Sequence, residues 1–141
     1  MSFFALLMLG AAASIPGPVH SVLVAKSHAH HWIRGADDEQ HTLWFDEAFL
    51  GQADIEGRIY PTLLVRSYLK GGEGKVILDS EIAVNCAWGA TAILSVWNSM
   101  AGLNSNPEPV HDIRFSDALL RDDTNAERVM QLACPKRAHK P

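Results

Sequence analysis

Apolar and polar side chains alternate along much of the chain from about residue 28 onward, which is the pattern of β-strands with one buried face. In residues 59–70 the odd positions Ile59, Leu63, Val65 and Leu69 form an apolar face, and in residues 76–86 one face carries Val76, Leu78, Ser80, Ile82, Val84 and Cys86. The opposite faces carry Thr62, Arg66, Lys70, Asp79, Glu81 and Asn85. Between the two segments, a glycine-rich stretch at 71–74 tolerates the positive φ of a tight turn. We therefore predict a β-hairpin with Leu63, Val65, Ile82 and Val84 inside and with Arg66 and Glu81 outside.

Shorter segments add strands to this hairpin. Residues 91–97 alternate in the same way, with Ile93 and Trp97 on one side of the strand and Leu94 and Val96 on the other. Residues 110–115 predict a weaker strand. Residues 31–33 and 42–45 predict two short strands separated by a polar turn at 35–40. The sheet is therefore expected to have about five to six strands.

The last apolar pattern has the period of a helix. Ala126, Val129, Met130 and Ala133 recur at helical spacing, and Pro135 ends the segment. Thr124 followed by Glu127 matches a capping box. So narrow a stripe needs an apolar partner, and one face of the sheet is the obvious one. The expected fold is α+β: a small antiparallel sheet with a C-terminal α-helix packed on one face.

The first 25 residues differ from the rest of the chain in their lack of charged side chains. Residues 1–25 contain none of the 12 basic and 16 acidic residues, and their apolar run at 3–9 is too short to cross a bilayer. Small residues at 11 and 13, and again at 27 and 29, suit a signal peptidase. We predict an export segment over 1–29 cleaved between 13 and 29, a folded domain over 30–135 and a basic tail over 136–141. No cysteine follows the apolar run, so a lipid anchor is not expected.

The two cysteines lie at positions where a disulfide is expected. Cys86 shares the inward face of its strand, and Cys134 borders the apolar stripe of the predicted helix. In an exported chain an even pair at such positions predicts a bond that ties the helix to the sheet. It would span 134 − 86 = 48 residues. The loop-entropy model values such a closure at roughly 4 kcal/mol.

Composition and motifs disfavour several function classes. A net formal charge of −4 argues against a protein held on nucleic acid by phosphate contacts. The sequence has no nucleophile elbow, and the glycines at 71–74 lack the spacing of a phosphate-binding loop. The acidic runs at 37–39 and 122–123 are expected to be solvated turn charges and helix-entry charges. We therefore expect no enzyme, no catalytic residue and no cofactor.

Histidines and tryptophans leave two alternatives open. His28, His30 and His31 lie on one short segment, and His41 follows the predicted turn, so these four are candidate zinc or copper ligands. Because the spacing offers no carboxylate or cysteine to complete the set, no metal site is predicted from it. The four tryptophans suggest a stacking platform for sugars. Trp88 and Trp97, in or beside strands, are instead expected to pack in or near the core.

The order of several residues resembles a known family. Trp32 precedes an aromatic–Asp pair at 45–46, a glycine-turn strand follows at 57–60, a later strand ends at Asn85 and Cys86, and a short helix closes on Cys134. This layout resembles the surface-adhesin protein E-like domain of Gram-negative envelopes and would cover residues 31–134. The resemblance implies a small antiparallel sheet with a C-terminal helix, closed by one disulfide. The adhesin that names the family binds host matrix proteins and is lipid-anchored, whereas this sequence lacks the lipobox cysteine.

Taken together, these patterns predict an exported, non-enzymatic envelope protein, periplasmic or secreted. It would act as a small binding, adhesin-like or structural module for a protein partner, without a transmembrane segment once the signal is removed. One alternative is a periplasmic metal-binding protein that uses residues 28–31. Another is a small hydrolase whose site the sequence does not reveal.

Overall fold

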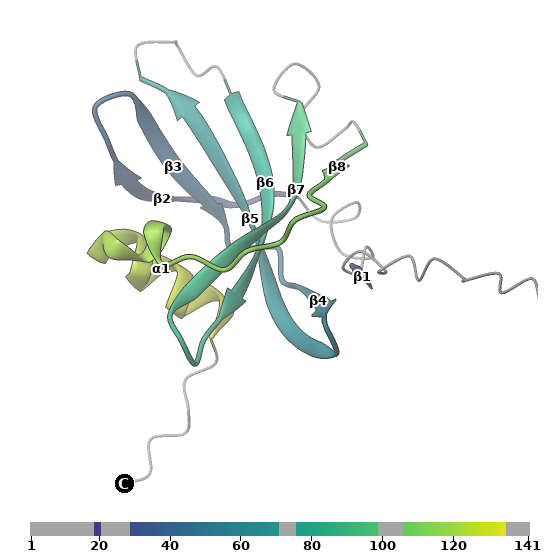
Figure 1. Cartoon of the computed structure of the whole chain (residues 1–141). Coiled ribbons are helices and arrows are strands. Elements are labelled where there is room, and N and C mark those ends of the chain that lie inside the picture. Colours follow the sequence, from purple (N-terminus) through teal and green to yellow (C-terminus); the bar gives the residue numbers. More distant parts are fainter. Residues whose placement is uncertain (1–18, 21–28, 71–75, 99–105, 135–141) are drawn as a thin grey trace, which may run out of the picture.

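The computed structural model describes residues 19–20, 29–70, 76–98 and 106–134. Within these ranges the chain forms an antiparallel sheet of eight strands with one α-helix after it (Figure 1). The strands are β1 (Val19–His20), β2 (Trp32–Asp37), β3 (His41–Asp46), β4 (Gly51–Ile55), β5 (Arg58–Leu69), β6 (Val76–Asn85), β7 (Ala90–Asn98) and β8 (Glu108–Pro109). A 3₁₀ turn, η2 (Ala118–Arg121), precedes the helix α1 (Asp123–Ala133). The predicted sheet with a C-terminal helix is confirmed, but the fold is mostly β and has more strands than expected.

Some predictions fall outside the described residues. They include the glycine-rich turn, the basic tail, and the predicted cleavage window except for residues 19–20 and 29. The export segment and the domain boundaries therefore stay predictions. The two described residues of β1 pair with Ala53 and Asp54 of β4.

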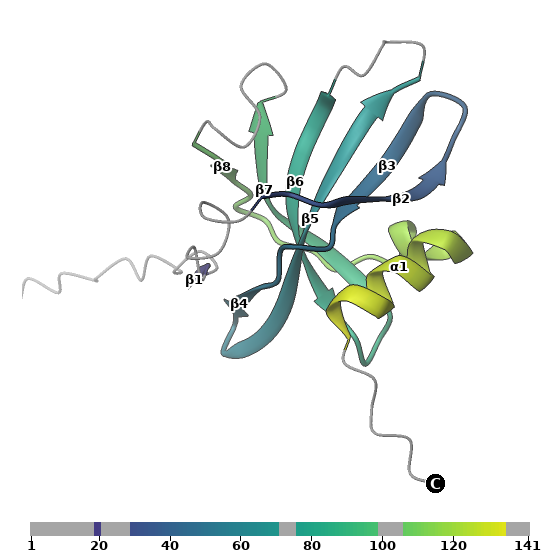
Figure 2. The same cartoon turned by 180° about the vertical axis from the view of Figure 1, so that it is seen from behind.

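The long strand β5 lies at the centre of the sheet. Its first half pairs with β4, and its second half pairs with β3 along the same edge. Strand β6 pairs along the other edge, from Thr62↔Ala83 to Tyr68↔Val76, which confirms the predicted hairpin. Figure 2 shows β3 and β4 diverging toward opposite ends of β5. The sheet therefore branches at β5, and β2 extends the β3 branch.

Strand β4 was not among the predicted strands, because it has only five residues and because Gly51 and Ala53 give its inward face a weak apolar signal. Its pairing with β5 depends on a two-residue turn at Glu56 and Gly57, whose φ angles are 52° and 81°. Two successive positive φ angles give the twist that an antiparallel hairpin needs. The Asp54 carboxylate accepts a hydrogen bond from the Gly57 N–H at 2.9 Å and holds the turn.

One face of the sheet packs against α1 to form the main core. Leu63, Val65, Ile82 and Val84, the four residues predicted inside, are all 6% exposed or less. They pack with Phe45 of β3 and with Val129 and Ala133 of α1. The sulfur atoms of Cys86 and Cys134 are bonded at the border of this core, with their Cα atoms 5.7 Å apart. The disulfide therefore joins the end of β6 to the C-terminus of α1.

The opposite face of the sheet is also buried, which corrects the sequence prediction. Four residues expected in solvent are 7% exposed or less, namely Thr62, Asp79, Glu81 and Asn85. Arg66, also expected in solvent, is half-buried. Conversely, Ile59 and Leu69 are 61% and 42% exposed. Alternation assigns residues to faces but cannot say what covers the second face. Here Trp32 packs over Leu64 and Trp97, while the segment before η2 packs over Ala83 and Leu94.

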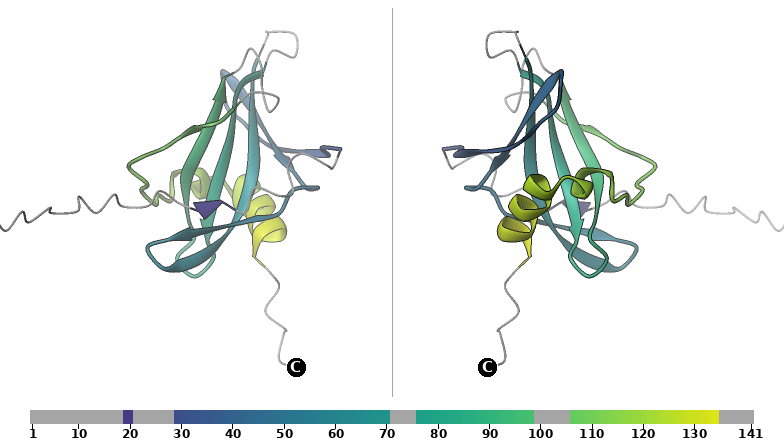
Figure 3. Two further views of the ribbon diagram at one scale, coloured as in Figure 1. Left: turned by 90° about the vertical axis from the view of Figure 1, so that its right-hand side faces the viewer. Right: turned by 90° about the vertical axis from the view of Figure 1, so that its left-hand side faces the viewer.

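The segment at 110–115 is not a strand, although it contributes to this second face. Its side chains Ile113 and Phe115 are half-buried, and the Phe115 ring lies 4.9 Å from that of Tyr60. Figure 3 shows β8 and α1 on opposite sides of the sheet, so the chain between them passes from one face to the other. The prediction for Trp97 is confirmed, but Trp88 is 77% exposed because it lies in the turn after β6.

Helix α1 begins two residues earlier than the predicted capping box at Thr124 implies. The N-cap is Asp122, whose carboxylate accepts hydrogen bonds from the backbone N–H groups of Thr124 and Asn125. Met130, predicted inside, is 38% exposed, and Asn125 is buried in its place. The Asn125 side chain accepts a hydrogen bond from the Ala36 N–H of β2 at 2.9 Å. A polar residue therefore occupies the packed side of the helix because it bonds to strand backbone.

Candidate functional site

A row of side chains crosses five neighbouring strands on the face opposite α1. Arg34 is opposite Trp44, Trp44 is opposite Arg66, Arg66 is opposite Asp79, and Asp79 is opposite Trp97. Residues directly opposite one another in antiparallel strands project from the same face of the sheet. The strand register alone therefore brings together two guanidinium groups, two indoles and a carboxylate.

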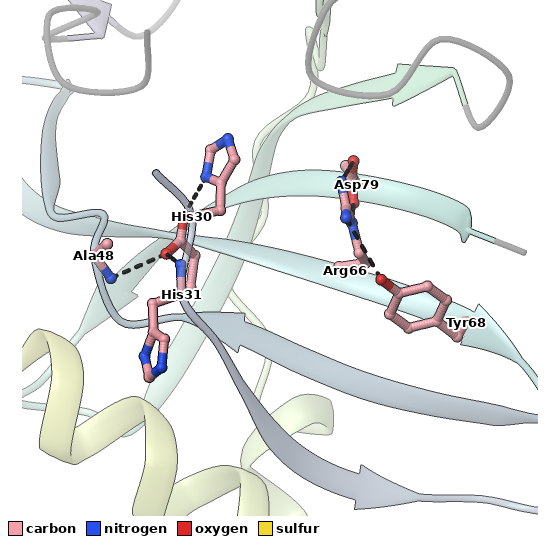
Figure 4. A network of polar contacts seen from close by, with 7 residues as sticks. His30, His31, Ala48, Arg66, Tyr68 and Asp79 are labelled. Carbon is pink, nitrogen blue, oxygen red and sulfur yellow. Dashed lines mark hydrogen bonds and ion pairs between the residues drawn. The ribbon is translucent and has the colours of Figure 1, made fainter. Parts of the chain in front are cut away.

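The centre of this row is a buried ion pair. The Arg66 Nε donates to Asp79 Oδ1 at 2.7 Å, and Nη2 donates to Oδ2 at 2.9 Å (Figure 4). The Asp79 side chain is 1% exposed and that of Arg66 is 18% exposed. The hydrogen bonds that Arg66 donates to Asp79 raise the pKa of the Arg66 guanidinium above its already high ordinary value. Two parallel bonds fix a planar guanidinium in one orientation, so Arg66 is a permanently charged, positioned group.

Two aromatic rings flank the guanidinium of Arg66. Its Cζ lies 4.4 Å from the centroid of the Trp32 ring and 5.9 Å from that of Tyr68. The Arg66 Nη1 also approaches the Tyr68 hydroxyl at 3.5 Å, as Figure 4 shows. A cation over an aromatic face is attracted by the negative potential of the ring, most strongly for Trp. Trp32 therefore covers Arg66 and shields the ion pair from water.

A pocket of about 440 Å³ opens beside this cluster. We refer to it as the aromatic pocket; it is lined by Trp32, Arg34, Thr42, Trp44 and Tyr68. The rings of Trp44 and Tyr68 lie 6.2 Å apart at 86°, so they form a corner with one ring edge-on to the other. Small-molecule sites in proteins commonly combine such apolar walls with a few fixed polar groups. The aromatic pocket has both.

Paired charges lie at the rim of the aromatic pocket. The Arg34 guanidinium donates to both carboxylate oxygens of Asp37, through Nη2 at 2.5 Å and Nε at 3.3 Å. The Lys70 Nζ lies 3.6 Å from the same carboxylate. The hydrogen bonds from Arg34 hold the pKa of Asp37 below its ordinary value, so this carboxylate remains ionised into the acid range. The rim therefore carries two cationic side chains around one carboxylate, with Arg34 and Asp37 directly hydrogen-bonded.

A second polar cluster surrounds Asp46 at the end of β3. This buried carboxylate accepts hydrogen bonds from the backbone N–H groups of His31 and Ala48, at 3.0 and 2.9 Å (Figure 4). Its other oxygen lies 2.5 Å from Nδ1 of His30. The contacts with His30 and His31 tie the segment before β2 to the end of β3, and the contact with Ala48 closes the turn after β3. Asp46 therefore holds β2 in register with β3.

The candidate metal ligands are not brought together. His30 contacts Asp46, His31 contacts Glu47, and His41 contacts Asp38, while His28 lies outside the described residues. Among the residues that the structure describes, no group of three or more His, Cys, Asp and Glu side chains is arranged to hold a metal ion. The alternative of a metal-binding protein therefore gains no support from His30, His31 and His41.

The acidic runs have the structural positions that were expected of them. Asp38 accepts hydrogen bonds from the backbone N–H groups of Gln40 and His41 in the turn between β2 and β3. These bonds lower the pKa of Asp38 from its ordinary value. Asp122 caps α1 as described above. Both carboxylates accept hydrogen bonds from backbone N–H groups, which explains why acidic residues occur at this turn and at the start of the helix.

Sequence reasoning did not find the aromatic pocket. Trp32, Trp44 and Tyr68 come from three strands, and each looks like an isolated aromatic residue in its own segment. The signal was present in the register: a hairpin around the turn at 38–40 places Arg34 opposite Trp44. Only the pairing of β3 with β5, which are not adjacent in the sequence, adds Arg66 and Tyr68.

Comparisons with protein-family models, with curated proteins and with solved structures gave no match. The resemblance to surface-adhesin protein E-like domains therefore remains a hypothesis that these comparisons do not test.

Proposed function

We propose that this protein is an exported, non-enzymatic binding module and that the aromatic pocket is its ligand site. One observation carries the proposal: the sheet holds Arg66 in a bidentate ion pair under Trp32, next to an open corner of Trp44 and Tyr68. A binding site needs groups that are fixed before the ligand arrives, because less conformational entropy is then lost on binding. Arg66, Trp32 and Tyr68 meet this condition.

Export is part of the proposal because the disulfide favours an oxidising compartment. The bond between Cys86 and Cys134 is of the kind that persists outside the reducing cytosol. Within the described ranges, no helix is long and apolar enough to span a membrane. The disulfide is consistent with an exported protein, and the charge-free segment at 1–25 supports a signal peptide. The module would act as an adhesin-like or envelope-binding protein.

The proposed ligand site is tested by NMR on the oxidised, exported protein labelled with ¹⁵N. The probes are neutral disaccharides, galacturonate oligomers and a proline-rich peptide, added one at a time. We expect at least one probe to shift the indole N–H signals of Trp32 and Trp44 in a saturable way. The signal of Trp88, which is 77% exposed and outside the pocket, is the internal control. If no probe shifts the pocket signals, the aromatic pocket is not the ligand site.

A further inference from the structure

We infer that the aromatic pocket binds a neutral hexopyranose, the terminal sugar of an oligosaccharide chain. This inference rests on the proposed function and adds to it the chemical class of the ligand. It follows from three properties of the pocket: the angle between its aromatic rings, the pairing of its charges, and the position of Arg66 over Trp32.

The ring geometry favours a compact ligand with an apolar face. Trp44 and Tyr68 meet at 86°, so they enclose a corner and do not form a flat platform. A pyranose ring presents a patch of C–H groups that packs on an aromatic face, while its edge carries hydroxyl groups. One such ring lies against Trp44 with its edge toward Tyr68, and a volume of about 440 Å³ has room for one or two rings. A corner of this kind suits the end of a sugar chain better than its middle.

The arginines in and beside the pocket already have carboxylate partners. Arg66 is bonded to Asp79, and Arg34 is bonded to Asp37, which also lies 3.6 Å from the Lys70 Nζ. An anionic ligand would have to compete with these carboxylates for the same guanidinium donors. A hydroxyl group both donates and accepts hydrogen bonds, so it bonds to an existing arginine–carboxylate pair without displacing either member. Hydroxyl groups of a sugar therefore match the rim formed by Arg34 and Asp37.

The position of Arg66 disfavours a cationic ligand. Aromatic cages bind alkylammonium groups through the negative potential over their rings. Here the Arg66 guanidinium already lies 4.4 Å from the centroid of Trp32, and it carries a permanent positive charge. A second cation in the aromatic pocket would meet electrostatic repulsion from it. A methylated lysine or a choline group is therefore a poor ligand for this site.

A proline-rich peptide is the strongest competing ligand, and the geometry disfavours it. Such peptides bind extended grooves between aromatic ridges, in which successive turns of a polyproline helix are held. The aromatic pocket is a single corner bounded on one side by the ion pair of Arg34 and Asp37. Its lining residues make up one subsite of this kind.

The test is a titration of the oxidised protein with four probes: maltose, cellobiose, a galacturonate disaccharide and a proline-rich decapeptide. We expect saturable shifts of the Trp32 and Trp44 indole signals with at least one of the neutral disaccharides. In Trp44→Ala we expect the affinity for that disaccharide to fall about tenfold or more, because one wall of the corner is lost. Trp44→Phe should keep most of the affinity, and Trp88→Ala should keep all of it.

Each outcome bears on the inference separately from the proposed function. Binding of the galacturonate disaccharide or of the peptide alone would overturn the inference and leave the aromatic pocket as a ligand site. Shifts that persist unchanged in Trp44→Ala would overturn it as well. Failure of all four probes would overturn the inference and the proposed function together. The melting temperature of each variant is measured alongside, and if Trp44→Ala does not fold, Tyr68→Ala, which removes the other wall of the corner, is expected to show the same loss of affinity.

Discussion

Asp79 is the residue on which the geometry of the aromatic pocket depends most. Its carboxylate is 1% exposed, and it positions the Arg66 guanidinium through both oxygens. A buried ion pair adds little net stability compared with an apolar pair of the same shape, because both charges lose their hydration. Removing one partner is different, since the remaining charge then stays buried without compensation. The pair therefore acts mainly to fix the position of Arg66.

Replacement of Asp79 tests this interpretation. Asp79→Ala should lower the free energy of unfolding by about 3–5 kcal/mol, because Arg66 is left half-buried and unpaired. The double variant Arg66→Met with Asp79→Leu should lose clearly less, since no charge then remains in the site. Urea unfolding followed by tryptophan fluorescence measures both values. Equal losses in the single and double variants would mean that packing, not the unpaired charge, determines the cost.

Among the secondary-structure elements, α1 both covers the core and bonds to the backbone of β2. Strand β2 pairs with β3 on one side only, and α1 contacts its backbone from another direction. Asn125 accepts the Ala36 N–H, and Arg128 Nε donates to the Arg34 carbonyl at 3.1 Å. The close approach requires glycine at 35, where a Cβ atom would lie 2.6 Å from the Phe45 ring and 2.7 Å from Asn125 Oδ1. Side chains of α1 thus form hydrogen bonds with backbone groups of β2 that would otherwise be free to pair with a further strand.

The contact between α1 and β2 leads to a prediction for Asn125. Asn125→Ala should lower the free energy of unfolding by about 1–3 kcal/mol, because the Ala36 N–H loses its acceptor. Hydrogen exchange should show the Ala36 amide losing protection while the amides of β6 keep theirs. Glu127→Ala, an exposed change on the same helix, is the matched control and should have little effect. An Ala36 amide that stays protected in Asn125→Ala would contradict the assigned contact.

The sequence predicts the strands and the helix whose residues repeat a regular pattern. It does not predict the features that depend on contacts between distant segments. The hairpin of β5 and β6, the strand β7 and the helix were predicted because alternation or helical spacing identifies them. The burial of Thr62 and Glu81 was not, because it depends on side chains from distant segments that cover the second face. The cap at Asp122 was missed because two acidic residues precede Thr124, and either site satisfies the rule for a cap. The aromatic pocket was missed for the same reason as the second face: it is assembled across strands.

For the whole molecule, the disulfide joins the helix to the sheet at one border of the main core. It connects β6 to the end of α1 across 48 residues, at the border of the cluster that contains Val84 and Val129. Helix α1 has 11 residues, which is too short to be stable in isolation. The bond therefore keeps the helix on the sheet, and with it the contacts between α1 and β2.

Loss of the disulfide should loosen α1 before the sheet. Reduction, or Cys134→Ser, should lower the free energy of unfolding by about 2–5 kcal/mol. Hydrogen exchange should show protection lost first in α1, while the amides shared by β5 and β6 remain protected longer. In the native oxidised protein, thiol reagents should label neither Cys86 nor Cys134 until a reductant is added. Two thiols that react freely in the folded, exported protein would contradict the bond and the proposed compartment.

The hydrogen bonds between β2 and α1 form late in synthesis, because β2 is made early and α1 is the last helix or strand of the described fold. Ala36 and Asn125 are 89 residues apart, and at about 5–20 residues per second the ribosome takes roughly 4–18 s to make the stretch between them. Throughout that interval β2 exists without the helix that later occupies its backbone groups. An uncovered strand edge is a template for pairing with other chains, so α1 protects β2 only after the last residues of the domain have been made and have docked.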